Sequence, residues 1–105
     1  MLGEGAEEAS SIGRKRRVAK RVLKCRGGVT SLLLSKDEAT LYTGDVSGEA
    51  VAWDVASGTR KQTLACDGEV LCLALSKDEA TLFTGDDSKK VVAWDVASVD
   101  RKSVV

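Results

Sequence analysis

The 105-residue sequence contains no histidine and no proline, and its aromatic residues are two tryptophans, one tyrosine and one phenylalanine. Without histidine, neither a Ser–His–Asp nor a Cys–His nucleophilic arrangement can form, and zinc loses a principal nitrogen ligand. A glycine-rich phosphate loop is also missing, because Gly27-Gly28 is an isolated turn pair. We therefore expect a non-enzymatic protein with no catalytic residues, no metal site and no cofactor.

Cysteine is scarce as well. Cys25, Cys66 and Cys72 are odd in number and form no CxxC pair, so we expect reduced thiols that pack as small apolar groups. No apolar run approaches the roughly 18 residues that span a membrane, and the acidic start does not resemble a secretory signal. The sequence predicts an intracellular protein, cytoplasmic or nuclear, that does not enter membranes.

The formal net charge of zero hides an uneven distribution. Residues 14–26 hold eight basic and no acidic residues, whereas residues 27–105 hold thirteen acidic and eight basic ones. We expect residues 1–19 to be a flexible extension, first acidic and then basic. Its cluster Arg14, Lys15, Arg16 and Arg17 supports an alternative hypothesis, a nuclear or nucleic-acid-associated protein that uses residues 14–26. No aromatic residue interleaves with these charges, so base stacking is not supported.

One pattern is written twice, with Trp53 returning as Trp94 at an offset of 41 residues. Residues 29–58 and 70–99 share 21 identities in 30 positions. A fixed period near 40 residues indicates a repeat architecture.

Each copy reads as short β-strands about ten residues apart, separated by Gly, Asp and Ser. We expect strands at 29–34, 39–43, 50–55 and 60–66, and again at 70–75, 80–84, 91–96 and about 101–105. The offset also pairs Lys20–Cys25 with Lys61–Cys66 and favours a strand there, although the spacing of Val18 and Val22 also allows a short basic helix.

Trp53-Asp54 and Trp94-Asp95 close the third strand of each copy, and Thr43-Gly44 and Thr84-Gly85 end the second. With these pairs in register, the chain resembles the WD40-repeat β-propeller family. The resemblance implies an all-β fold: two antiparallel four-stranded blades of a partial propeller within residues 20–105, with repeats at about 20–60 and 61–105, and a basic N-terminal extension. It implies a scaffold for protein–protein interaction, with both tryptophans packed inside the blades.

The chain departs from the family where Gly-His usually precedes the first strand, since Cys25-Arg26 and Cys66-Asp67 stand near those places. The family's usual Asp between the second and third strands is Ser47 or Ser88 here. We therefore expect the polar network of each blade to be absent, or rebuilt through Asp45 and Asp86.

Two blades cannot cover their own apolar faces, because repeat units bury these faces mainly on their neighbours. The residues concerned are Leu32, Leu34, Leu41, Val51 and Trp53 and their counterparts. This favours a fragment of a longer propeller over a chain that self-associates to complete one.

The resemblance implies that partners bind the turns at one end of the blades, at 45–49, 66–69 and 86–90. The partners would be proteins of unspecified identity, with nucleic acid as the second hypothesis. The candidate interaction residues are Asp45, Ser47, Glu49, Asp67, Asp86, Asp87, Ser88 and Lys89.

Overall fold

The computed structural model describes residues 20–97 and 101–104. They form two four-stranded antiparallel sheets, each with its strands in sequence order. Sheet 1 consists of β1 (Val29–Leu34), β2 (Thr40–Asp45), β3 (Glu49–Asp54) and β4 (Thr59–Ala65). Sheet 2 consists of β5 (Val70–Leu75), β6 (Thr81–Asp86), β7 (Val91–Asp95) and β8 (Arg101–Val104). The all-β expectation of two four-stranded meanders is confirmed.

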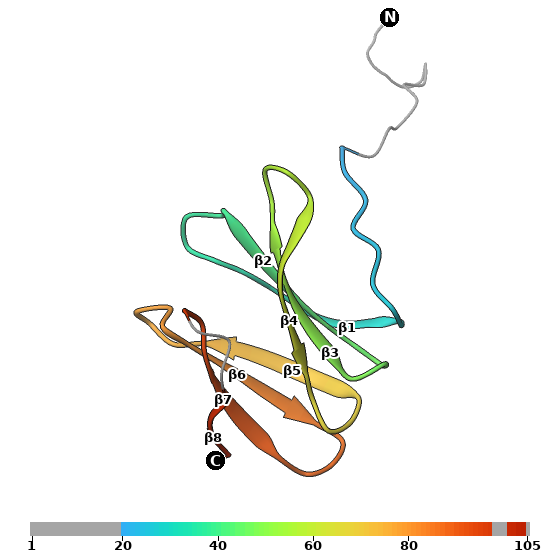
Figure 1. Cartoon of the computed structure of the whole chain (residues 1–105), viewed down its shortest axis with the longest axis vertical. Coiled ribbons are helices and arrows are strands. Elements are labelled where there is room, and N and C mark those ends of the chain that lie inside the picture. Colours follow the sequence, from blue (N-terminus) through green and yellow to red (C-terminus); the bar gives the residue numbers. More distant parts are fainter. Residues whose placement is uncertain (1–19, 98–100, 105) are drawn as a thin grey trace, which may run out of the picture.

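The two sheets lie face to face, and β5 packs against β1 and β2 (Figure 1). Both sheets share the same irregularities of register, one between Val29 and Ser31 and its counterpart between Val70 and Cys72. The structure therefore repeats at the same offset as the sequence.

Register divides the residues of each sheet between two faces, because successive side chains of a strand point to opposite sides. We call one side the trailing face; in sheet 1 it carries Leu33, Tyr42, Gly44, Ala50 and Ala52. We call the other side the leading face; in sheet 1 it carries Leu32, Leu34, Leu41, Thr43, Val51 and Trp53.

The trailing face of sheet 1 packs on the leading face of sheet 2, and we call this contact the joint. Its buried cluster joins Tyr42, Ala50, Ala52 and Leu64 to Leu82, Val92 and Trp94. Leu82 is 1% exposed and Val92 is 0% exposed, so the joint is closely packed. Burial of a Leu or Val side chain stabilises a fold by about 1.5–3 kcal/mol, which makes the joint the main core of the molecule.

Gly44 allows the close approach at the joint. A Cβ atom at Gly44 would lie 2.4 Å from Cγ1 of Val70, which is fully buried. The Thr30 hydroxyl adds polar contacts across the same place, donating to the carbonyls of Gly44 and Val70.

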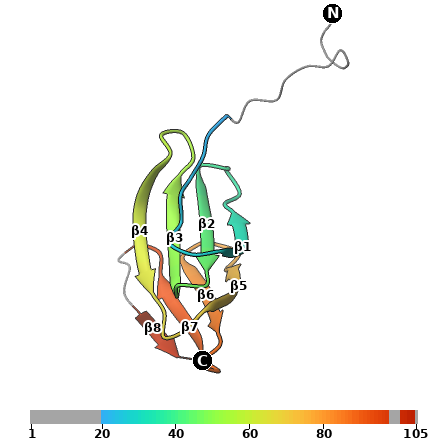
Figure 2. The same ribbon diagram turned by 90° about the vertical axis from the view of Figure 1, so that its right-hand side faces the viewer.

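The predicted strand at Lys20–Cys25 is wrong, since residues 20–28 form neither a strand nor a helix. β4, the counterpart of this segment, is a strand because it pairs with β3. Among the described residues no strand precedes residues 20–25 to offer such an edge. They instead run as an irregular strap, defined as residues 20–27, over the leading face of sheet 1 (Figure 2).

The expectation of uncovered apolar residues holds for part of the leading face of sheet 1. Leu32 is 65% exposed and Leu34 is 47% exposed. Val51 and Trp53 are buried, and the guanidinium of Arg60 lies 5.0 Å from the ring centre of Trp53.

The joint predicts different effects for one substitution at two matched sites. Gly44→Ala forces a methyl group into Val70 and into Oγ of Ser31 at 2.7 Å, whereas Gly85→Ala meets only Sγ of Cys72, at 2.8 Å. We expect Gly44→Ala to lower the free energy of unfolding by about 1–3 kcal/mol more than Gly85→Ala, because overpacking is costly. Urea denaturation of both variants measures the difference, and equal losses would contradict the packing described here.

Candidate functional site

A chain of polar side chains links each sheet to the segment that precedes it. In sheet 2, the indole N–H of Trp94 donates to Oγ1 of Thr84 at 2.9 Å, and Sγ of Cys66 donates to the same oxygen at 3.7 Å. In sheet 1, Trp53 donates to Thr43 at 3.0 Å, and Cys25 lies 3.7 Å from the same hydroxyl. The network is therefore not absent: around each tryptophan it is rebuilt through cysteine and threonine. Asp45 and Asp86 add a second link, because they accept from the backbone amides of Gly27 and Asp67 in the preceding segments.

This network shows that the strap occupies on sheet 1 the position that β4 and Cys66 occupy on sheet 2. Arg21 of the strap donates to the carbonyls of Ala56 at 2.7 Å and Ser57 at 3.1 Å. Its counterpart Gln62 donates in the same way to the carbonyl of Val96 at 3.0 Å.

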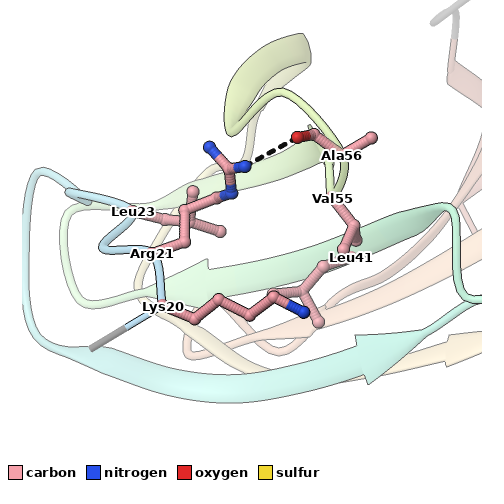
Figure 3. Close-up of a pocket in the computed structure, with 6 residues that line it drawn as sticks. All are labelled: Lys20, Arg21, Leu23, Leu41, Val55 and Ala56. Atoms are coloured by element: carbon pink, nitrogen blue, oxygen red, sulfur yellow. Dashed lines mark hydrogen bonds between the residues drawn. The ribbon is translucent and has the colours of Figure 1, made fainter. Parts of the chain in front are cut away.

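A shallow pocket of about 360 Å³ lies between the strap and sheet 1. Its lining residues, drawn in Figure 3, are Lys20, Arg21, Leu23, Leu41, Val55 and Ala56. Leu23 and Leu41 provide apolar surface, and Arg21 is already engaged with Ala56. The pocket is the gap left where the strap incompletely covers the leading face.

The three turns that carry the candidate interaction residues form one continuous surface, which we call the turn rim (45–49, 66–69 and 86–90). The amide of Cys66 donates to the carbonyl of Gly48 at 2.8 Å, and the amide of Asp87 donates to the carbonyl of Glu69 at 3.0 Å. Gly68 packs so closely on Asp87 that a Cβ would lie 2.0 Å from Oδ1 of that residue. The structure therefore brings the predicted residues together.

Asp45 and Asp86 face inward and hold the turns of this surface. Asp45 is 1% exposed and accepts from the amide of Ser47 at 2.9 Å, from its hydroxyl at 2.6 Å and from the amide of Glu49 at 3.2 Å. Asp86, 6% exposed, accepts from the amide and hydroxyl of Ser88. Ser47 and Ser88 are therefore structural partners of these carboxylates.

Hydrogen bonding sets the ionisation of both carboxyl groups. Burial raises the pKa of Asp45, but the donors of Ser47, Glu49 and Gly27 together outweigh it, so the pKa lies below its ordinary value. The Ser88 hydroxyl is the largest influence on Asp86, whose pKa is also lowered.

Other residues of the turn rim form surface ion pairs. Glu49 lies 3.2 Å from Arg26 of the strap and 3.4 Å from Arg60 of β4. Lys90 lies 3.1 Å from Asp67. Asp87 and Lys89 are exposed, and Lys89 adopts a left-handed backbone conformation with φ of 72°.

The cluster Arg14–Arg17 lies outside the described residues. Of the described part of the basic run, Arg21 and Arg26 bind sheet 1, as the contacts above show. This role was not predicted from the sequence. The available signal was that Arg26 and Glu49 carry opposite charges, as do their counterparts Asp67 and Lys90.

Among residues 20–97, no three His, Cys, Asp or Glu side chains converge as ligands of a metal ion. The same part of the chain holds no helix long and apolar enough to cross a membrane.

Comparison with known proteins shows what the chain is similar to. The family described as "WD domain, G-beta repeat" matches residues 58–95. The crystal structure of the RRP9 WD40 repeats superimposes with a TM-score of 0.76 at 25% identity, covering 81% of this chain and 28% of that one. The structure of U3-55K gives a TM-score of 0.77 at 25% identity with the same coverage. No curated protein sequence matches the chain. The chain thus spans little more than a quarter of the length of these solved chains.

The buried network predicts a loss of stability when its acceptor is removed. Thr84→Val keeps the shape of a fully buried side chain but takes away the oxygen that receives the Trp94 indole N–H. We expect a loss of about 1–3 kcal/mol, the cost of an unsatisfied buried donor. Thermal and urea denaturation followed by tryptophan fluorescence measures it. The exposed Thr63→Val is the control, and equal behaviour of the two variants would refute the role of Thr84.

The lowered pKa of Asp45 predicts how acid affects stability. A depressed carboxyl pKa contributes stability above the unfolded-state value of 3.8, and this contribution is lost as pH falls through the folded-state pKa. Asp45→Asn should therefore be less stable than the natural chain at pH 7, and the gap should shrink below about pH 4. Urea denaturation from pH 2 to 7 tests this; a gap independent of pH would contradict it.

Proposed function

Because the chain belongs to the WD40-repeat family and its two sheets are blades of a partial propeller, we propose that it is a non-catalytic module for protein–protein interaction. Domains of this family generally act as binding scaffolds, which supports this class of function. The observation that carries the proposal for this chain is the turn rim, where three turns far apart in sequence form one hydrogen-bonded surface.

The turn rim is suited to recognition because its backbone is held firmly. The carboxylates of Asp45 and Asp86 and the backbone hydrogen bonds that join the three turns fix the turns before any partner arrives. A preorganised surface loses little conformational entropy on binding. Affinity then comes from the groups that remain accessible.

The accessible groups are of both charges. Ser47, Asp67, Asp87 and Lys89 are exposed, while Asp45 and Asp86 leave little surface for a partner. We propose that Asp87 and Lys89 contact a partner protein directly. The inward carboxylates support those contacts by keeping the turns in place.

The chemistry of these groups supports binding rather than catalysis. Oδ1 of Asp45 receives three hydrogen bonds from its own turn, and its lowered pKa keeps it ionised at neutral pH, so it is a poor general acid or base. The thiols of Cys25 and Cys66 lie beside the hydroxyls of Thr43 and Thr84 inside the blades.

An exchange of the two exposed charges tests the turn rim. The double variant Asp87→Lys with Lys89→Glu keeps the net charge and inverts its pattern. We expect proteins captured from source-cell extract by the tagged natural chain to be retained at least about tenfold less by this variant, since wrongly placed charges oppose specific binding. Quantitative mass spectrometry measures the retention.

Thr63→Lys, on the exposed outer strand β4, serves as the matched control and should capture the same proteins as the natural chain. Equal capture by the charge-exchanged variant would contradict binding through the turn rim.

A further inference from the structure

Each sheet uses one of its two faces at the joint. Within the described residues, the leading face of sheet 1 and the trailing face of sheet 2 do not pack on another sheet. At the joint, fully buried Val70 fills the space over Gly44. The counterpart of Val70 is Val29, which is 51% exposed on sheet 1. The counterpart of Gly44 is Gly85, where an added Cβ would meet only the sulfur of Cys72. Sheet 1 thus exposes Val29 with no glycine beneath it, and sheet 2 has a space at Gly85 that no valine fills.

The apolar side chains around these two positions show the same difference. Ala50 on the joint is 1% exposed, whereas its counterpart Val91 on the trailing face of sheet 2 is 41% exposed. On the leading faces, Leu73 is half-buried at the joint and its counterpart Leu32 is 65% exposed. Each exposed residue has the type of side chain that packs well at the joint.

The polar contacts of the joint also have unused counterparts. The backbone amide of Lys36 donates to Oε2 of Glu79 at 2.7 Å, and Nζ of Lys36 donates to the carbonyl of Lys77 at 3.1 Å. The counterpart groups, Lys77 and Glu38, are exposed. Glu38 and Glu79 share a φ of 62°, so the two turns have the same backbone conformation at this position.

We propose that a second copy of this chain docks on the first by repeating the joint. The trailing face of sheet 2 in one copy packs on the leading face of sheet 1 in the other, with Val29 over Gly85 and Lys77 beside Glu38. The internal joint supports the complementarity of these surfaces, since the two pairs of faces are built from counterpart residues. The surface differs from the turn rim, so this inference goes beyond the proposed function.

The contact is heterologous, because each copy contributes a different face. Such a contact leaves one unused face at each end of a pair and closes into a ring or continues as an open chain.

Two differences make the new contact weaker than the joint. At the joint the hydroxyl of Thr30 donates hydrogen bonds. In the new contact its counterpart is Leu71, which has no donor to replace them. The strap occupies the strip of the leading face where β8 of the docked copy would lie, because both segments are counterparts of β4. Docking therefore displaces one of them from this strip, and we expect dissociation constants of about 10–100 µM.

Sedimentation velocity of the 105-residue chain over a range of concentrations around these values tests the proposal. We expect the average mass to rise with concentration. Val29→Glu blocks the leading face and Val91→Glu blocks the trailing face, and each should weaken association at least tenfold. Val46→Glu, at a valine of the turn rim that is 48% exposed, should leave it unchanged. Circular dichroism confirms that the variants, all at exposed positions, remain folded.

A mixture of the two blocked variants gives the sharpest test. Each variant retains one intact face of the opposite kind, so an equal mixture should form dimers that stop at two copies, while each variant alone stays monomeric. The proposal is overturned if the natural chain remains monomeric, if Val46→Glu weakens association as much as Val29→Glu, or if mixing restores nothing. A monomeric natural chain would leave binding at the turn rim unaffected.

Discussion

The packing of one sheet on the next is the constraint on which the rest of this structure depends. Every sheet has apolar side chains on both faces, so a single sheet in water would leave too much of that surface exposed. The joint buries one face of each sheet around Leu82, Val92 and Tyr42. Its closeness requires a residue without a side chain at Gly44. The turns and the strap are arranged around this contact.

A polar network then fixes the segment that crosses from one sheet to the next. A threonine of the second strand receives the tryptophan N–H from inside its sheet and lies within hydrogen-bond distance of a cysteine thiol of the preceding segment. A buried donor requires a hydrogen-bond acceptor, and the chain supplies one to each buried indole N–H without using histidine. The same arrangement at Cys25 explains why the strap follows sheet 1 although it forms no strand. Covalent sequence order and side-chain chemistry place it there, although no strand among residues 20–97 and 101–104 pairs with it.

Most of the fold could be predicted because its signals are local and stated twice. The turn residues around Asp45 and Asp86 separate short apolar runs, and the repeat shows which segments are equivalent. Strand formation at residues 20–25 could not be judged in this way, because a strand needs a partner edge to pair with, and the match to β4 does not show that such an edge is present. The turn rim was predicted as a location, but the inward direction of the Asp45 and Asp86 carboxylates was not. Their burial follows from hydrogen bonds to Ser47 and Ser88, and the two-residue Asp–Ser spacing was the available signal.

The joint makes the two sheets one cooperative unit, and native-state hydrogen exchange of the backbone amides tests this cooperativity most directly. The amides of β2 and β3 in sheet 1 and of β6 and β7 in sheet 2 report on the two sheets separately. If the joint supports both sheets, the slowest amides of these four strands will exchange with one common free energy and the same dependence on denaturant. Two distinct free energies, with one sheet opening while the other remains protected, would contradict the account.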